Sequence, residues 1–397
     1  MKRPVKILLY TSSVVLILVS LYFRYDGLKF VSNDMINAIF PWFEYVQQHG
    51  LREALRHDFL NYTYSYAYLY LIALASKASL FLNRGTYVKL PGYFFDVFSA
   101  FMIFKLVFHK YKDFALSIFA GALFFALPTV ILNSSYWGQA DNTFTAFLLC
   151  SVYFILTDRP IWSTVAWGVA FSLKLQAIFL LPFLLFAILI KKMKWWHLFF
   201  SALAFLVLML PVIIAGRPFL EILNPYLWQS ASTGEWTLNA PSLYVLLLSW
   251  LPQESPDLIV LPVISLVILA WVLWSVRNYH KQDDDYIMGM ALGSVVIAPF
   301  LLPHMHERYF YPADALSLAF AFYVPRLYVL PIFFQISSYL VYRNYLYYDF
   351  DRTMSPYRKS WAAFINLISI LIILGWQFYQ KKTWKLKSKE IAPVNSG

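Results

Sequence analysis

Apolar runs about as long as a bilayer is thick recur along this chain, and they constrain its fold more than any other feature. A helix needs roughly 20 predominantly apolar residues to cross the hydrocarbon layer. Apolar and aromatic residues make up 60% of the 397 residues, and charged residues only 13%. Soluble domains carry about 25% charged residues. These properties predict an all-α polytopic membrane protein.

About twelve of these runs are candidate transmembrane helices, and two of them are short. We therefore expect a single integral membrane domain, residues 1–397, with about 12 transmembrane helices. The lone Cys150 lies inside one run, which argues against disulfides and against a cysteine-based metal site. The candidate spans lie near residues 7–23, 90–108, 114–131, 141–157, 161–173, 175–190, 197–215, 258–276, 286–302, 312–324, 327–342 and 360–379.

Basic residues concentrate in particular loops and thereby predict the orientation. A net charge of +11 suggests nucleic acid binding in a soluble protein, but in a membrane protein Lys and Arg gather in cytoplasmic loops. We expect both termini in the cytoplasm and no nucleic acid partner. The predicted cytoplasmic segments are residues 1–6, 109–113, 159, 191–194, 277–281, 326 and 381–389.

The first outer loop, residues 24–89, contains an apolar segment that breaks this alternation. Residues 62–82 would place the following basic loop on the wrong side if they crossed, so we expect a re-entrant or interfacial segment. Residues 41–57 alternate apolar and charged positions as an amphipathic helix on the membrane does; an ordinary loop helix is the alternative. A second long outer loop is predicted at 217–257.

Polar and ionisable residues gather on the predicted outer side, and this clustering is the main functional signal. Each charge near bilayer depth costs on the order of a few kcal/mol, so such groups usually face a cavity or one another. The residues concerned are Asp34, Gln139, Asp141, Lys174, Gln176, Asn239, His304, His306, Glu307 and Arg308.

Structural roles are alternatives for three of these residues. Asp34 and Asp141 each stand where a helix is expected to begin, so either carboxylate could be an N-cap, and we expect capping for Asp141. Lys174 lies between two apolar runs. Its ammonium must therefore meet an anion or extend to the membrane surface.

The stretch LLPHMHERYFYP collects titratable groups between two apolar runs. Pro303 should end a helix, and in the extended chain expected after it His304 and His306 point the same way. With Arg308 nearby they suit a phosphate, because charge-assisted donors bind strongly in a partly dehydrated pocket. The alternative is a metal site ligated by His304, His306 and Glu307, but no second histidine cluster completes it.

This His-x-His-Glu-basic stretch resembles an element of the GT-C superfamily of glycosyltransferases, particularly the dolichyl-phosphate-glucose glucosyltransferases and their bacterial relatives. An early outer loop with an acidic residue ahead of PWFEY is also similar. The resemblance covers most of the chain. Three further segments are similar to elements of these enzymes in the same order: NSSYWGQADNTFTAF (133–147), AFSLKLQAIFLLPFLL (170–185) and WTLNAPSLYVLL (236–247).

The resemblance implies a GT-C-like membrane fold with its active site on the outer face. It implies a polyprenyl-phosphate-sugar donor, a glycan or glycolipid acceptor, and Asp34 as the general base. Many relatives carry a second acidic residue beside the first, but here the neighbours are Asn33 and Met35. We therefore expect no metal held by paired carboxylates and no cofactor. The residues that the resemblance assigns to the donor's phosphate are His304, His306, Glu307 and Arg308.

The chemistry of such a transfer requires the same two parts. Cations steady the departing phosphate, and a carboxylate on the far side of the anomeric carbon takes the proton of the acceptor hydroxyl. Direct attack opposite the phosphate inverts the anomeric centre. We expect Lys174 to reach the same phosphate. The small loops suggest a bacterial plasma membrane, with the active site on the extracytoplasmic face.

Two other classes of protein are alternatives. A lipid or anion transporter, or a flippase, predicts ionisable groups near the midplane and repeated halves. Asp96 is the nearest example of such a group, although it could simply pair with Lys89 or Lys105. A membrane acyltransferase with a histidine base is the second alternative.

Overall fold

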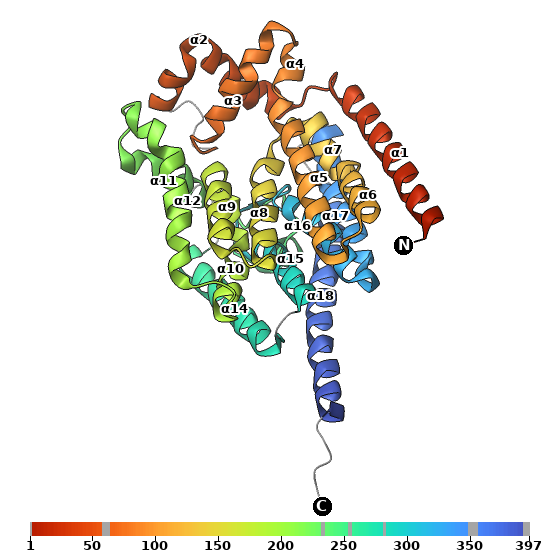
Figure 1. The fold of residues 1–397 in the computed structure, drawn as a ribbon. Helices are drawn as coiled ribbons and strands as arrows, with labels where there is room; N and C mark the ends of the chain where they lie inside the picture. The colour runs from red at the N-terminus through yellow and green to blue at the C-terminus, as the bar shows by residue number, and fades with distance from the viewer. Residues whose placement is uncertain are drawn as a thin grey trace, which may run out of the picture.

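The computed structural model describes residues 2–57, 64–231, 235–252, 256–280, 283–347 and 356–391, which form a bundle of helices (Figure 1). The longer helices are α1 Arg3–Gly27, α2 Phe40–Arg56, α3 Tyr68–Ser76, α5 Leu90–Tyr111, α6 Phe114–Phe125, α8 Asp141–Leu156, α9 Pro160–Leu173, α10 Leu181–Leu189, α11 Leu198–Ile214, α12 Asn224–Ala231, α14 Asp257–Asn278, α15 Asp284–Leu301, α16 Tyr311–Tyr323, α17 Val329–Tyr347 and α18 Pro356–Ile391.

Short elements connect these helices. Two strands, β1 Thr237–Leu238 and β2 Met305–His306, pair in parallel. The α-helical turns are α4 Arg84–Tyr87, α7 Pro128–Ile131 and α13 Leu243–Leu247. The π-helical segments are η1 Met35–Ile39 and η3 Leu132–Trp137, and the 3-10 segments are η2 Lys77–Leu80, η4 Leu175–Leu180, η5 Trp195–His197, η6 Phe219–Leu223, η7 Leu248–Trp250 and η8 Pro325–Leu327. The all-α prediction is confirmed.

The number of complete spans is lower than the predicted twelve when length and apolar character are required together. Six helices of the described residues meet both requirements, and the bent pair Phe114–Phe125 and Pro128–Trp137 adds a seventh span if it counts as one. Several other apolar runs, including those of α8 and α9, form shorter helices. In the described part of the chain the six helices that meet both requirements are Arg3–Gly27, Arg84–Tyr111, Trp195–Ile214, Asp257–Asn278, Asp284–Leu301 and Arg358–Gln380.

These helices differ in what they face. Every residue of α15 from Tyr286 to Phe300 is buried, so this helix runs through the centre of the bundle. Most apolar side chains of α1 are exposed, among them Leu8, Val14 and Leu18. In an integral membrane protein such an apolar exposed helix faces lipid.

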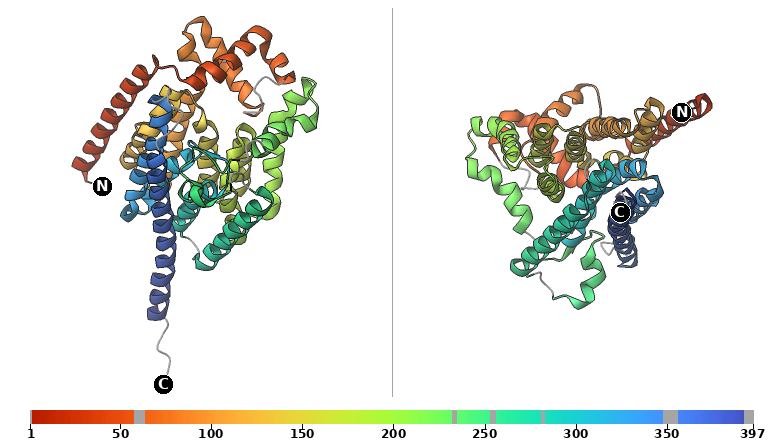
Figure 2. Two further views of the ribbon diagram at one scale, coloured as in Figure 1. Left: turned by 180° about the vertical axis from the view of Figure 1, so that it is seen from behind. Right: turned by 60° about the horizontal axis from the view of Figure 1, so that its bottom comes forward.

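One end of the bundle is covered by a layer made of α2, α3 and α4 (Figure 1). Helix α18 runs from this end of the bundle to the opposite end (Figure 2). Helix α3 and η2 together occupy Tyr68–Leu80, which is too short to cross a bilayer of about 30 Å. Helix α2 forms in the predicted segment, is broken at Gly50, and buries Trp42, Val46 and Leu55 inside the protein; its contact with the membrane stays a prediction.

A bend before α7 and a tight turn after η3 carry the chain into this end of the bundle. Helix α6 and the segment Pro128–Trp137 are inclined by 51°, because proline disfavours a helical conformation at the preceding Leu127. The turn at Gly138 has a φ of +74°, in the left-handed region. A Cβ there would lie 2.8 Å from the side chain of Met35, so this position requires glycine.

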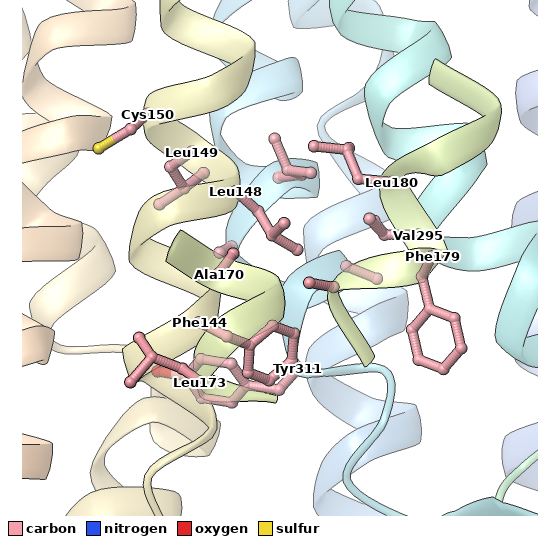
Figure 3. Close-up of a cluster of buried hydrophobic side chains, with 14 of the residues drawn as sticks. Phe144, Leu148, Leu149, Cys150, Ala170, Leu173, Phe179, Leu180, Val295 and Tyr311 are labelled. Atoms are coloured by element: carbon pink, nitrogen blue, oxygen red, sulfur yellow. The ribbon is translucent and has the colours of Figure 1, made fainter. Parts of the chain in front are cut away.

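A continuous apolar core fills the inside of the helix bundle. Side chains of α8, α9, η4 and α15 meet in this core, as Figure 3 shows for Leu148, Ala170, Leu180 and Val295. Phe144, at the start of α8, belongs to the same core. The helices that carry polar residues at their ends are therefore fixed relative to one another by close packing.

The buried carboxylate of Asp96 in α5 pairs with Arg24 in α1. Arg24 NH1 donates to Asp96 Oδ2 at 2.6 Å, and both side chains are buried. The prediction that Asp96 pairs with Lys89 or Lys105 is wrong. Lys89 instead donates to backbone carbonyl oxygens. The Arg24–Asp96 pair therefore ties the lipid-facing α1 to the bundle.

Candidate functional site

The loop that carries Asp34 connects α1 to η1 and is held at two points. The buried ammonium of Lys89 donates to two carbonyl oxygens, at the end of α1 and just after it, both at 2.7 Å. The Ser32 hydroxyl donates to the carbonyl oxygen of Trp137 at 2.7 Å. The backbone around Asp34 is therefore anchored to α5 and to η3.

Two side-chain donors hold the Asp34 carboxylate itself. Trp137 Nε1 donates to Asp34 Oδ2 at 2.9 Å, and Gln139 Nε2 donates to the same oxygen at 2.5 Å. Gln139 Oε1 in turn accepts a hydrogen bond of 2.9 Å from the Tyr64 hydroxyl. Asp34 makes no capping hydrogen bond to η1. The capping alternative for Asp34 is therefore wrong, and the carboxylate is oriented by the turn around Gly138.

Asp141, the first residue of α8, forms a buried ion pair. Lys174 Nζ donates to Asp141 Oδ1, and Asn133 Nδ2 donates to Asp141 Oδ2 at 2.9 Å. The expected capping role of Asp141 is wrong, because Ala140 occupies the cap position without a side-chain hydrogen bond. Lys174 therefore pairs with an anion, which is one of the two alternatives predicted from the sequence.

Arg308 connects the two carboxylates. Its NH1 lies 3.9 Å from Asp34 Oδ2, and its Nε lies 3.8 Å from Asp141 Oδ2. A closer contact of 3.0 Å joins NH1 to Glu307 Oε1. Trp137 places its ring 5.6 Å from the guanidinium carbon. Residues from the first loop, from η3 to α8 and from the loop before α16 therefore form one cluster.

The opposite charges of this cluster keep one another ionised. Burial by itself would lower the pKa of Arg308, but the carboxylates of Glu307, Asp141 and Asp34 outweigh it and raise that pKa well above its usual value. Burial by itself would raise the pKa of Glu307, but the neighbouring His306 and the charge of Arg308 hold that pKa at about 2. Both side chains therefore stay charged across the physiological pH range.

His304 does not lie with His306, contrary to the prediction that both rings point the same way. The extended strand begins only at Met305, and His304 has a left-handed φ of +62°. Its Nδ1 lies 2.5 Å from the carbonyl oxygen of Glu235, and its Nε2 lies 2.9 Å from Asp257 Oδ2. His304 therefore joins three segments outside the Arg308 cluster.

His306 lies at the edge of the cluster, on β2. Its Nδ1 is 3.8 Å from Glu307 Oε2, and its ring packs edge to face against Tyr309. The backbone of Asn239 forms an antiparallel bridge with His306. Asn239 Oδ1 accepts a hydrogen bond from Lys359 of α18. Two sequence-predicted residues, Asn239 and His306, are thus neighbours across the short sheet.

Gln176 lies on η4 next to an apolar cavity of about 330 Å³. Tyr309, Met305 and His304 also line this cavity. A second cavity of about 250 Å³ continues along α10 and α14, and both are lined by Ile178, Phe179 and Leu302. The polar cluster is therefore flanked by an elongated apolar groove.

The proposed ligands of the alternative metal site do not converge. Within the described ranges, no group of three or more His, Cys, Asp or Glu side chains is arranged to hold a metal ion. His304 contacts Asp257, whereas Glu307 contacts Arg308. The donor set of the cluster, in which each carboxylate lies near a cation, fits an anionic ligand better than a metal ion.

Sequence reasoning missed several residues that complete the cluster. Trp137 donates to Asp34, and Tyr64 donates to Gln139. Trp137 lies in the segment 133–147, where an indole directly before Gly-Gln is a local signal for such a role. Lys359 stands at the start of an apolar helix, where a basic residue is ordinary. No local pattern distinguishes it from other basic residues at helix ends.

Comparison with known proteins identifies the chemistry. Residues 62–303, more than half of the chain, match the family model of glycosyltransferase family 87. No curated protein matches the chain. The match supports a glycosyltransferase, but not the specific likeness to dolichyl-phosphate-glucose glucosyltransferases. It gives no support to a transporter. Together with its apolar helices, this match shows that the chain is an integral membrane protein that belongs to glycosyltransferase family 87.

Proposed function

We propose that this enzyme moves a hexose from a polyprenyl-phosphate donor to an extracytoplasmic acceptor, a lipid-linked or cell-envelope glycan. The observation that carries the proposal is the position of Arg308. Its NH1 lies 3.9 Å from the oriented carboxylate of Asp34 and 3.0 Å from Glu307, which in turn lies 3.8 Å from His306. A base and an anion-binding group are thus held in one cluster.

Asp34 is the proposed general base. Trp137 and Gln139 both donate to Oδ2 and so hold the carboxylate in one direction. A positioned base that removes the proton of an attacking hydroxyl accelerates a transfer by about 10²–10⁴-fold. Attack from this side, opposite the leaving phosphate, is a direct displacement with inversion.

Arg308 and His306 are the proposed ligands of the donor's phosphate. The distances of 3.8 and 3.9 Å from Arg308 to Asp141 and Asp34 are too long for hydrogen bonds. Its buried Nε has no hydrogen-bond partner among the described residues. The guanidinium therefore keeps donor capacity for phosphate oxygens, and stabilisation of the departing charge is a large part of such catalysis.

Two residues expected to touch the phosphate receive supporting roles in this proposal. Lys174 neutralises Asp141 beside Arg308, and so prevents a second uncompensated carboxylate from competing for the guanidinium. His304 ties the loop before β2 to Asp257. Both roles place the phosphate ligands without direct contact.

The apolar groove supports a polyprenyl donor. It runs from Gln176 and Tyr309 along α10 and α14, and is lined mainly by aliphatic and aromatic side chains. Tyr309, which lines this groove, packs against His306, so an isoprenoid tail in the groove could extend its phosphate toward His306. We propose a bacterial plasma membrane as the location, with the acceptor site on the extracytoplasmic face.

The test is a transfer assay with the purified protein in lipid nanodiscs. Polyprenyl-phosphate hexoses carrying a labelled sugar are supplied with a membrane-glycolipid acceptor fraction, and nucleotide sugars serve as the alternative donors. We expect labelled product from a polyprenyl-phosphate donor only, with an inverted anomeric configuration. Transfer from a nucleotide sugar, or retention of configuration, contradicts the proposal.

A further inference from the structure

We propose that Lys359, at the start of α18, is a further ligand of an anionic phosphate and completes the group formed by His306 and Arg308. This inference rests on the proposed function, because it assigns a residue to the leaving phosphate of that reaction. Lys359 lies outside the 62–303 range that matches the family.

Asn239 connects the start of α18 to the strand that carries His306. Lys359 Nζ donates to Asn239 Oδ1, and the backbone of Asn239 is bridged to His306. Asn239 has a left-handed φ of +69°, a conformation that asparagine adopts more readily than most residues. The end of β1 thus places the ammonium of Lys359 beside the strand that carries His306.

The charges at this edge are unequal. The buried carboxylate of Glu307 contacts Arg308 at 3.0 Å and lies 3.8 Å from His306. Lys359 donates to Asn239, whose backbone is bridged to His306. Three basic side chains therefore belong to the part of the site that holds this one buried carboxylate, and a monoanionic phosphodiester balances them.

Lys359 has donors to spare. An ammonium carries three N–H donors, and Asn239 Oδ1 is the hydrogen-bond acceptor that the described residues provide for it. The side chain is half-buried, so its charge is partly desolvated and free to approach a ligand. A compact ammonium on a flexible stem is a common phosphate ligand.

The contacts of Lys359 are separate from those of the base. Its Nζ donates to Asn239, whose backbone is bridged to His306, whereas Trp137 and Gln139 donate to Asp34. A phosphate bound by Lys359 and His306 therefore uses donors other than those that orient the base.

The experiment measures binding of two probes to purified protein: a polyprenyl monophosphate and the polyprenol of the same length. We expect Lys359→Gln to weaken binding of the phosphate about tenfold and to leave binding of the alcohol unchanged. Lys359→Arg should recover most of the affinity. Lys29→Gln, a change at an exposed lysine near the end of α1, should leave both probes at wild-type affinity.

The competing explanation is that Lys359 only clamps α18 to Asn239. In that case Asn239→Ala should reproduce the effect of Lys359→Gln, and both probes should weaken together. That result, or an unchanged affinity in Lys359→Gln, overturns this inference alone. If the wild-type protein binds the two probes equally, the donor class of the proposed function fails as well.

Discussion

Arg24 and Arg308 are two largely buried cations beside carboxylates, but only Arg24 is saturated. Its NH1 donates to Asp96 at 2.6 Å, and its other nitrogens donate to a hydroxyl and a carbonyl oxygen. Arg308 makes one close contact, to Glu307, and its Nε has no hydrogen-bond partner among the described residues. Arg24 lies in the last turn of α1, which leads to the loop of Asp34, and Arg308 lies 3.9 Å from Asp34 itself.

The difference separates a structural ion pair from a binding site. A buried ion pair is tolerated when further hydrogen bonds satisfy the remaining donors, and Asp96 also accepts from Ser134 and Asn142. Unsatisfied donors in a buried cluster need a reason, such as an absent ligand. The comparison therefore assigns stability to Arg24 and anion binding to Arg308.

The largest expected effect is on the base beside Arg308. Asp34→Asn should lower turnover by about 10²–10⁴-fold, because an amide cannot take the proton of the acceptor hydroxyl. Folding should persist, since the amide oxygen can still accept from Trp137 and Gln139. Donor binding by the purified variant should match that of the wild type. Near-normal turnover of Asp34→Asn, with turnover lost in Asp141→Asn, would make Asp141 the base.

Breaking the saturated pair should affect stability rather than chemistry. Arg24→Ala leaves the Asp96 carboxylate buried without its partner, which should lower the free energy of unfolding by about 3–5 kcal/mol. Thermal denaturation in detergent measures this loss. The double variant Arg24→Leu with Asp96→Asn should recover part of the stability, because both charges are removed.

The same pair also sharpens the comparison through kinetics. The fraction of Arg24→Ala that remains folded should show a wild-type KM for the donor. A raised donor KM in that fraction would place Arg24 within the binding site and remove the distinction between the two arginines.

Removing the unsaturated cation should affect the donor. Arg308→Ala or His306→Ala removes a charge-assisted hydrogen bond of roughly 1.5–3 kcal/mol, so donor affinity or transfer should fall about ten- to hundredfold. The KM for the acceptor should change little. An effect confined to the acceptor would contradict the assignment of this cluster to the donor's phosphate.

A smaller effect is expected from the groups that orient the base. Gln139→Ala removes its hydrogen bond to Asp34 Oδ2, leaves the one from Trp137, and should lower kcat by up to about tenfold, since a hydrogen bond contributes about 0.5–1.5 kcal/mol. The matched control is Gln335→Ala, whose side chain donates to Thr129. Equal losses of kcat in both variants would show a general loss of packing instead.

The smallest expected effect is that of a chelator. Because the proposed partner of Arg308 and His306 is a phosphate, EDTA should leave the rate of transfer unchanged. The rate is compared in the purified protein before and after EDTA and after added Mg²⁺ or Mn²⁺. A requirement for added ion that depends on His304 and His306 would make these histidines metal ligands.

Much of the site could be predicted because its residues are unusual in their local setting. Asp34, Lys174 and Arg308 are charges beside apolar runs, and charges in such places need partners. The identities of the partners could not be predicted. Lys174 pairs with Asp141, 33 residues earlier, and Asp34 is held by Gln139, 105 residues later.

Local geometry accounts for the predictions that failed. An extended chain after Pro303 would have aligned His304 with His306, but a left-handed residue at His304 turns the first ring toward Asp257. Asp141 was expected to cap α8, but Lys174 lies within reach of its carboxylate. In both cases a contact between distant segments prevailed over a local preference.

The sequence by itself determined that this protein is an all-α membrane protein and which residues are chemically out of place, because apolar run length and isolated charges are local properties. The tertiary structure alone decided which charges became saturated. Arg24 meets Asp96 and further acceptors because α1 packs against α6 and η3, whereas Arg308 lies 3.9 and 3.8 Å from Asp34 and Asp141, beyond hydrogen-bond distance. Hydrogen bonds form only where packing brings donor and acceptor within about 3 Å, and that distance is set by the whole bundle.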